Sequence, residues 1–275
     1  MKRIYIEITS RCNIHCSFCH LSNRPDAVMD PAFFRRIVQD AKQYTDYIYL
    51  HVQGEPLTHP AFEEILNICD EEEMKVQLVT NGLLITQYPD LLQHPSLRKV
   101  SFSIQSVEYH TADPVQYMQN ILHFCRKASA QGRPYCEIRF WRDDQLSGTR
   151  TAQCLDEIRK SCTMEDSGRK NNWRIMPGVY VDMHNTFEWP ADANDGETEN
   201  GTCHGAVDQI AVLCDGTVVP CCLDSEGDIR LGNMKEQTMA DIFASPRYTA
   251  MAEGFKMHRL TEELCRRCTY RRRFA

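Results

Sequence analysis

The decisive stretch of this sequence is Arg11-Cys12-Asn13-Ile14-His15-Cys16-Ser17-Phe18-Cys19-His20, directly after the apolar-patterned segment Arg3-Ile4-Tyr5-Ile6-Glu7-Ile8. Its three cysteines have the spacing C-x3-C-x2-C on one short loop. Cysteine thiolates hold iron–sulfur clusters, and a [4Fe–4S] cluster normally takes four of them. Three thiolates without a fourth nearby leave one iron open, and an open position is typical of catalytic metal sites. The loop therefore predicts a metal site that carries out chemistry.

A zinc site is the alternative interpretation of this loop. Cys12, Cys16 and Cys19 could bind zinc together with His15 or His20, which would make a Cys3His site. Structural zinc sites are usually built from two separated ligand pairs, whereas the fourth ligand here would be a close neighbour in the chain. The loop alone leaves both interpretations open.

Composition limits the class of protein. The chain has 275 residues, 42% of them hydrophobic and 25% charged, as in globular proteins of one or two domains. Its 14 cysteines are many for a cytosolic enzyme and indicate metal ligands rather than disulfides. We find no apolar run of about 18 residues and no secretory signal, so we expect a cytoplasmic protein with no membrane partner. The net charge of −7 argues against a broad nucleic-acid-binding surface.

Short apolar segments alternate with helix-period segments over the first two-thirds of the chain, a pattern typical of βα units and a parallel sheet. The expected strands are Arg3–Ile8, Tyr47–Val52, Lys75–Val79, Lys99–Ile104, Cys136–Trp141 and Trp173–Val181. The expected helices begin at Pro31 and Pro60 and cover Val115–Ala130 and Ala152–Cys162. Six units are too few for a closed eight-stranded barrel. We therefore predict an α/β fold with a partial (β/α)6 TIM-type barrel, and a flavodoxin-like doubly wound sheet is the alternative.

Unusual residues fall at the carboxyl ends of these strands, where both folds bind ligands. The cysteine loop follows the first strand, and Gln53-Gly54-Glu55-Pro56 follows the second. The later strands end in, or are interrupted by, Thr80-Asn81-Gly82, Ser103 to Ser106, Arg139 to Arg142 and Met176-Pro177-Gly178. We expect all of these segments to line one mouth.

A second group of cysteines lies near the end of the chain. Between Ala191 and Gly201 the composition shifts to Asp, Asn, Gly, Glu and Thr, which predicts a boundary between domains 1–195 and 196–275. The second domain is expected to be a small cysteine-rich unit with a β-hairpin at Asp215-Gly216 and helices. That hairpin would bring Cys203 close to Cys221, and the pair Cys265 and Cys268 would complete a four-thiolate site. A four-cysteine zinc ribbon is the alternative.

These motifs resemble those of the radical S-adenosylmethionine (SAM) superfamily. The first loop is similar to its cluster motif, and Gly54-Glu55-Pro56 to its G-G-E-P element, with Gln53 in place of the first glycine. The tail is similar to the opening of a SPASM domain, C-x9-15-G-x4-C, in the truncated form called twitch. The resemblance implies SAM and two [4Fe–4S] clusters, with ligands Cys12, Cys16 and Cys19 for the first cluster and Cys203, Cys221, Cys265 and Cys268 for the second. It implies SAM contacts at Phe18, Gly54, Glu55, Thr80, Ser103, Gln105, Arg139 and Met176, with Arg142 a rival of Arg139 for the SAM carboxylate.

The resemblance also implies an activity. Radical SAM enzymes cleave SAM reductively to a 5′-deoxyadenosyl radical, which removes hydrogen from a substrate. We expect a peptide or small-molecule substrate, an oxidoreductase-type reaction with electron transfer through the second cluster, and an electron donor such as flavodoxin or ferredoxin. One alternative is an RNA-modifying enzyme, suggested by Arg266, Arg267, Arg271, Arg272 and Arg273 with Tyr270 and Phe274 available to stack on bases. Another is a non-catalytic iron–sulfur or zinc-binding protein.

No general acid or base can be assigned from the sequence. The carboxylates expected near strand ends are Glu7, Asp143, Asp144, Asp182 and Glu188, but surface carboxylates are common there. Cys222 is expected to pack or to form a pocket wall. The cysteines without partner spacing are expected to be inert buried thiols: Cys69, Cys125, Cys136, Cys154, Cys162 and Cys214.

Overall fold

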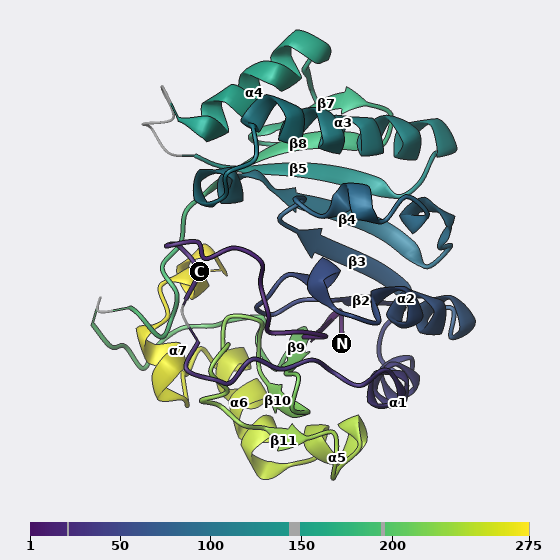
Figure 1. The fold of residues 1–275 in the computed structure, drawn as a ribbon. Helices are drawn as coiled ribbons and strands as arrows, with labels where there is room; N and C mark the ends of the chain where they lie inside the picture. The colour runs from purple at the N-terminus through teal and green to yellow at the C-terminus, as the bar shows by residue number, and fades with distance from the viewer. Residues whose placement is uncertain (21, 143–148, 194–195, 275) are drawn as a thin grey trace. The chain divides into compact units, whose positions relative to one another are not determined.

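The computed structural model describes residues 1–20, 22–142, 149–193 and 196–274 (Figure 1). The chain forms two compact units. The first contains Met1–Arg11, Ser17–Gly54 and Phe187–Ala275, and the second contains Cys12–Cys16 and Glu55–Thr186. The division into domains 1–195 and 196–275 remains a prediction. Among the described residues, no helix combines the length and apolar composition needed to cross a membrane.

Among its described residues, the first unit contains five strands in the order β11-β10-β9-β1-β2. Strand β1 is parallel to both β2 and β9, whereas β9, β10 and β11 are antiparallel. The antiparallel pairing of β9 with β10 confirms the predicted hairpin. Gly216 in its turn has a φ of 90°, a conformation that favours glycine. The strands are β1 Arg3–Ile6, β2 Tyr47–Tyr49, β9 Gln209–Val212, β10 Thr217–Val219 and β11 Gly232–Asn233.

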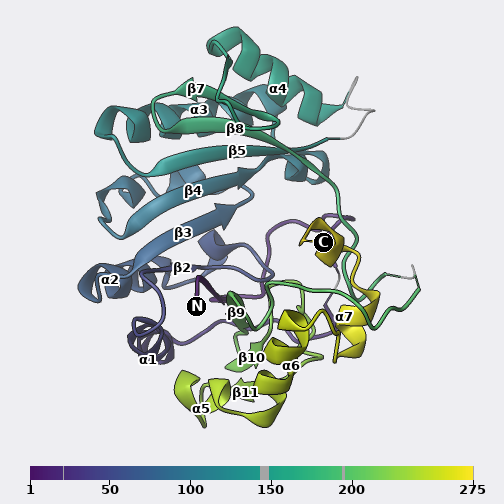
Figure 2. The same cartoon turned by 180° about the vertical axis from the view of Figure 1, so that it is seen from behind.

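Local signals explain the helices of the first unit. Helix α1, Pro31–Ala41, begins where predicted: the Asp30 carboxylate accepts a hydrogen bond from the Phe33 amide at 3.0 Å, and Pro31 occupies the first turn. The later helices are α5 Met239–Phe243, α6 Pro246–Lys256 and α7 Glu263–Arg267, followed by the 3-10 turn η5 at Tyr270–Phe274. In Figures 1 and 2, α5 and α6 lie close to β10 and β11.

The second unit contains four parallel strands, in the order β3-β4-β5-β8, extended by antiparallel β7 and β6. The strands are β3 Lys75–Thr80, β4 Leu97–Ser103, β5 Tyr135–Arg142, β6 Glu165–Asp166, β7 Asn172–Met176 and β8 Val179–Asn185. The helices are α2 Phe62–Glu71, α3 Pro114–Gln131 and α4 Arg150–Ser161. The short 3-10 helices are η1 Pro56–Thr58, η2 Ile85–Gln87, η3 Leu91–Gln93 and η4 Ile104–Tyr109.

Two expected boundaries in the second unit are wrong. Helix α2 begins at Phe62 rather than Pro60, because Ala61 has a non-helical backbone and serves as its N-cap. The sixth strand, expected over Trp173–Val181, is a hairpin of β7 and β8. The chain reverses at Pro177-Gly178, where Gly178 has a φ of 73°. The sixth parallel strand is therefore β8, which ends at Asn185.

Candidate functional site

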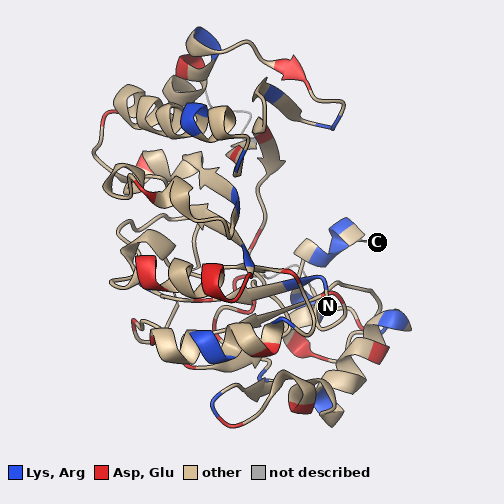
Figure 3. Cartoon of the chain, turned by 90° about the vertical axis from the view of Figure 1, so that its right-hand side faces the viewer, with Lys and Arg blue, Asp and Glu red and all other residues tan. Residues whose placement is uncertain are grey.

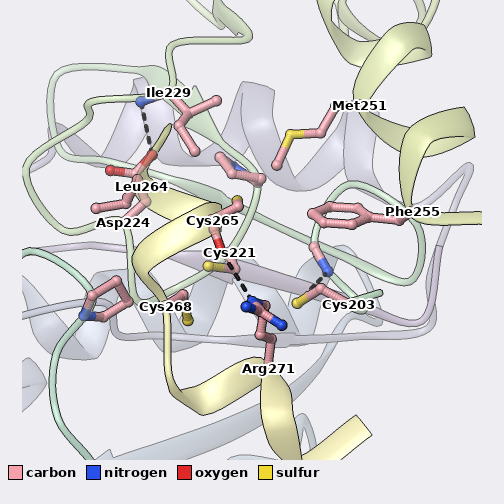
Figure 4. Close-up of a pocket in the computed structure, with 13 residues that line it drawn as sticks. Cys203, Cys221, Asp224, Ile229, Met251, Phe255, Leu264, Cys265, Cys268 and Arg271 are labelled. Atoms are coloured by element: carbon pink, nitrogen blue, oxygen red, sulfur yellow. Dashed lines mark hydrogen bonds between the residues drawn. The ribbon is translucent and has the colours of Figure 1, made fainter. Parts of the chain in front are cut away.

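The four tail cysteines line one cavity of the first unit (Figure 4). Cys203 precedes β9, Cys221 follows β10, and Cys265 and Cys268 lie in and just after α7. The cavity contains about 370 Å³ of space, part of it open to solvent. Three segments distant in sequence thus bring together the four cysteines that the spacing had paired.

The cavity wall suits a buried cluster. It is formed mainly by apolar side chains, and burial raises the pKa of all four thiols, so cluster assembly must displace protons there. Arg271 adds a positive charge and is held by a 3.1 Å hydrogen bond from its Nε to the Cys265 carbonyl. A cation beside thiolates offsets their negative charge. The apolar wall residues are Pro190, Pro220, Ile229, Met251, Phe255 and Leu264.

The four cysteines offer a donor set for a cluster rather than for a single metal ion. Within the described ranges, no three Cys, His, Asp or Glu side chains gather closely enough to bind a single metal ion. The four cysteines around the cavity nevertheless fit a [4Fe–4S] cluster, in which each thiolate binds a different iron. Gly205 brings two of the segments together, because its Cα lies so close to the chain at Pro220 that an added Cβ would be 3.3 Å from that carbonyl oxygen.

The Cys19 end of the first loop belongs to the first unit and is held by side chains from distant segments. The Trp189 indole donates a 2.9 Å hydrogen bond to the Phe18 carbonyl, and the Gln53 amide donates one of 3.1 Å to the His20 carbonyl. The His20 ring lies 3.0 Å from the Asp192 carboxylate. Gln53, which departs from the G-G-E-P pattern, therefore supports the residue that follows the third cysteine. Phe18 itself is half-buried.

Gly54 is required by a close backbone approach. It has a φ of 73°, and a Cβ there would lie 2.4 Å from the Thr9 carbonyl oxygen and 2.8 Å from that of Arg11. The end of the second strand segment thus presses against the backbone that leads into the cysteine loop, and only glycine permits this contact.

The Cys12–Cys16 part of the loop belongs to the second unit. Asn81, just after β3, donates a 2.8 Å hydrogen bond from its Nδ2 to the Asn13 side chain. Cys16 is buried and Cys12 is exposed. Neither asparagine had been assigned a role of its own from the sequence, although Thr80-Asn81-Gly82 was expected to line the mouth.

Glu55 and Thr80 form a buried network at the end of β3. The Glu55 carboxylate accepts hydrogen bonds from the Thr80 hydroxyl at 2.8 Å, the Asn81 amide at 2.6 Å and the Leu57 amide at 3.0 Å. Burial raises the pKa of Glu55 to about 7, although these hydrogen bonds act to lower it. Both side chains are thereby engaged with protein donors and acceptors, and they set the position of Asn81.

Ser103, Arg139 and Gln105 lie where the carboxyl end of β4 meets its neighbour β5. Arg139 is directly opposite Ser103 in the β4–β5 register, and its Nη2 donates a 2.7 Å hydrogen bond to the Ser103 hydroxyl. From the alternation of side chains along a strand, Ser103 and Gln105 would be expected on one face of the fourth strand. That expectation is wrong, because β4 ends at Ser103 and Gln105 lies in η4. Its Oε1 is buried without a hydrogen-bond donor from the described chain. Such an orphaned acceptor fits a polar ligand, such as a ribose hydroxyl.

Met176 does not lie at the carboxyl ends of the strands, where the sequence analysis had placed it. It ends the antiparallel strand β7 and pairs with Val179, whose partner in β5 is Cys136. Cys136 is at the amino-terminal end of β5, whereas Arg139 is closer to the carboxyl end. The hairpin that the sequence pattern concealed therefore carries Met176 to the opposite end of the strands.

The candidate carboxylates have structural partners or lie outside the described residues. Glu7 is fully buried and forms a two-pronged ion pair with Arg24, at 2.6 and 2.9 Å. Although burial acts to raise it, hydrogen bonds with His184, Asn172 and Glu137 lower the pKa of Asp182 to about 2. Glu188 is exposed. Outside the described residues lie Asp143, Asp144 and the side chain of Arg142.

The remaining cysteines and the arginine-rich end are largely accounted for. All 14 cysteines are among the described residues and none forms a disulfide, and of the six expected to be buried only Cys162 is partly exposed. Cys222 packs against the core around Tyr5. Figure 3 shows basic residues near the C-terminus, where Arg273 lies 4.5 Å above the Tyr270 ring. The Phe274 ring packs on His204.

Two family models match the chain. Residues 6–140 match the radical SAM superfamily, and residues 203–269 match SPASM, an iron–sulfur cluster-binding domain. The chain belongs to the radical SAM superfamily. It is a radical SAM enzyme with a SPASM-type domain, and these domains imply a [4Fe–4S] cluster with SAM and additional iron–sulfur binding in the tail.

Curated relatives match only part of this radical SAM enzyme. A tungsten-containing aldehyde ferredoxin oxidoreductase cofactor-modifying protein of Pyrococcus furiosus is 36% identical over 90 residues, 31% of this chain and 25% of that protein. A probable GTP 3′,8-cyclase of Methanococcus maripaludis is 30% identical over 116 residues, 41% of this chain and 37% of that protein. The chain therefore spans well under half the length of either relative.

Solved structures match almost the whole chain in fold. BtrN in complex with AdoMet and 2-DOIA is 20% identical with a TM-score of 0.63, covering 97% of this chain and 92% of that one. Streptococcus suis SuiB bound to S-adenosylmethionine is 17% identical with a TM-score of 0.63, covering 97% and 70%. The native anSMEcpe with AdoMet and the Cp18Cys peptide is 14% identical with a TM-score of 0.62, covering 98% and 86%. This likeness confirms the predicted α/β partial-barrel class rather than a flavodoxin-like sheet.

Proposed function

We propose that this radical SAM enzyme removes a hydrogen atom from a peptide or a small polar molecule and passes an electron through the cluster in its tail, an oxidoreductase-type reaction. When bound, the first cluster and SAM supply a 5′-deoxyadenosyl radical. Cys12, Cys16 and Cys19 would hold that cluster through three irons and leave one for SAM. A flavodoxin or ferredoxin would deliver the electron.

The SAM contacts in this proposal are those that the family resemblance implies. Gly54 exposes backbone beside the start of the loop, and Phe18 supplies an aromatic face. Arg139 would pair with the SAM carboxylate, since guanidinium and carboxylate form two parallel hydrogen bonds. Ser103 and the orphaned acceptor of Gln105 would bind ribose hydroxyls. Glu55 and Thr80 would act as supports, because both are engaged with each other.

The four-cysteine cavity is the observation that carries the electron-transfer role. Four protein thiolates complete the coordination of a [4Fe–4S] cluster and leave no iron for substrate. Such a cluster can change its charge by one electron without binding anything further. The cluster in the tail would therefore accept an electron from the substrate radical or deliver one to the N-terminal cluster. The apolar wall of the cavity would tune the reduction potential of this cluster.

Charged side chains on the strands of the second unit favour a polar substrate. Lys99 and Ser101 of β4 lie 2.9 and 2.8 Å from the Glu137 carboxylate of β5. Asp182 of β8 lies 3.6 Å from His184 and, by its low pKa, stays ionised near neutral pH. These groups alternate with buried apolar residues such as Val100 and Ile138, so they share the other sheet face. Solved relatives bind peptide or 2-DOIA, which is the basis for the two substrate classes.

Anaerobic reconstitution with iron, sulfide, SAM and dithionite tests the proposal. We expect 5′-deoxyadenosine from the wild type and none from Cys16→Ala, while Cys162→Ser, which changes a cysteine outside both groups, stays active. A substrate deuterated at the reacting carbon would transfer deuterium to deoxyadenosine. Absence of deoxyadenosine in a wild type that has taken up both clusters would support a non-catalytic binding protein instead.

A further inference from the structure

Two segments of the first unit contact both the auxiliary cavity and the Cys19 end of the first loop. The first segment follows β8. Pro190 lines the cavity, and on either side of it Trp189 donates to the Phe18 carbonyl and Asp192 accepts from the His20 ring. A shift of this short segment at the cavity would move the groups that hold the residues before and after Cys19.

The second segment follows Cys221. Asp224 and Ile229 line the cavity, and the Asp224 carboxylate accepts 2.9 Å hydrogen bonds from the amides of Asp228 and Ile229, which close the segment into a compact turn. The tip of that turn faces the other way. Glu226 accepts a 3.1 Å hydrogen bond from the Asn23 amide and lies 3.4 Å from the His20 ring.

The same turn also meets the buried ion pair at the base of the loop. The Ser225 carbonyl accepts a 2.6 Å hydrogen bond from Arg24, whose other nitrogens bind Glu7. The His20 side chain is only 10% exposed between Asp192 and Glu226. Four residues of this part of the chain are therefore held by segments that also wall the cavity or adjoin its wall: Phe18, His20, Asn23 and Arg24.

We propose that filling the four-cysteine cavity fixes these two segments and thereby positions the Cys19 end of the N-terminal loop, so that the two cofactor sites are coupled. Trp189 and Glu226 are positioning residues in this scheme, because they act through Phe18, His20 and Asn23. The coupling rests on the proposed function, in which both sites hold clusters. Linkage makes it reciprocal, so SAM binding at the loop also stabilises the filled cavity.

Amide hydrogen–deuterium exchange over residues 17–26 tests the coupling in anaerobically reconstituted protein. Local opening governs this exchange. Four variants are compared with the wild type. Cys265→Ala/Cys268→Ala removes two ligands of the cavity, and Trp189→Phe and Glu226→Ala each remove a hydrogen bond to residues around Cys19. Asp228→Ala is the control, because it removes an exposed carboxylate from the same turn as Glu226. We expect exchange about three- to tenfold faster in the first three, the factor for one lost hydrogen bond, and unchanged exchange in Asp228→Ala.

A second comparison separates coupling from simple loss of packing. Adding Glu226→Ala to the double cysteine variant should change exchange over residues 17–26 by less than twofold, because the link is already inactive. The EPR spectrum of the reduced N-terminal cluster with SAM should shift in Trp189→Phe and Glu226→Ala, although their cavity cysteines are intact. If the double cysteine variant loses protection throughout residues 203–269, the link variants alone decide the question.

The outcomes distinguish this inference from the function it rests on. If the wild type does not take up about eight irons per chain, as two [4Fe–4S] clusters require, the proposed function fails. If it does, but exchange over residues 17–26 and the EPR spectrum are the same in the link variants as in Asp228→Ala, the coupling is overturned and the two cofactor sites are independent.

Discussion

The two cysteine sites differ in how the chain builds them. The N-terminal site takes three cysteines from eight consecutive residues, and Cys12 and Cys19 are exposed. The C-terminal site takes four cysteines from three separated segments, all partly buried around an apolar cavity. The short exposed loop leaves room for an exchangeable ligand, whereas four thiolates would occupy every iron of a [4Fe–4S] cluster. The proposed function uses this difference, with a reactive site at the loop and an electron-transfer site in the tail.

Removing the cysteine ligands of one site at a time should have the largest effect on iron content and SAM cleavage. Cys12→Ala/Cys16→Ala/Cys19→Ala and Cys265→Ala/Cys268→Ala should each lose about four irons per chain, as expected for one [4Fe–4S] cluster. Only the triple variant should lose deoxyadenosine formation completely, because only the loop site has an open iron. Iron analysis and chromatography of deoxyadenosine measure both effects. Complete loss of SAM cleavage in the double variant, with the first cluster present, would contradict the division of roles.

Breaking the ion pair at the base of the loop should have the next largest effect. Arg24→Met leaves the fully buried Glu7 carboxylate without its guanidinium, which should cost about 3–5 kcal/mol in the free energy of unfolding. Arg174→Met is the matched control, because Arg174 and Glu165 form an equally short pair with both side chains more than half exposed. That control should cost much less, because solvent screens an exposed pair. Urea unfolding measures the free energy of unfolding of both variants. An equal loss in the two would show that burial does not determine how much the ion pair stabilises the protein.

Glu55 should make stability depend on pH. Because burial raises its pKa from 4.5 to about 7, the folded state binds this proton more tightly than the unfolded state. The resulting stabilisation is fully present below about pH 4.5 and is lost as the pH rises to about 7, an effect of about 3 kcal/mol at 1.36 kcal/mol per pKa unit. Glu55→Gln cannot titrate and should lack this component. Urea unfolding at pH 4.5 and 7.5 tests it, with the exposed Glu64→Gln as control; an unchanged pH slope in Glu55→Gln would count against it.

The smallest effect should come from the hydrogen bond that holds the Cys12–Cys16 part of the loop. Asn13→Ala removes the acceptor for Asn81, a loss of about 1 kcal/mol, or about fivefold in SAM affinity. His15→Ala, a change at an exposed neighbour, should leave SAM affinity and iron content unchanged. Loss of metal from His15→Ala would instead favour the zinc interpretation of the loop.

The sequence correctly predicted the features that depend on residues close together in the chain, and it failed for those that depend on tertiary packing. The Asp30-Pro31 helix start and the Asp215-Gly216 hairpin depend on neighbours in the chain and were predicted correctly. Gln105 and Met176 were misplaced because each depends on where a strand stops or reverses. Those limits are set by packing, which the local pattern of apolar residues does not encode.

By itself the sequence determined the family and the expected cofactors, because cluster ligands must be cysteines at set intervals in the chain. Only the tertiary structure decided that Cys203, Cys221, Cys265 and Cys268 share a cavity and that Glu55 serves Thr80 and Asn81. It also decided that Trp189, Asp192 and Glu226 hold the residues around Cys19. These contacts join residues up to about two hundred positions apart, and folding selects them by burying apolar surface and satisfying polar groups.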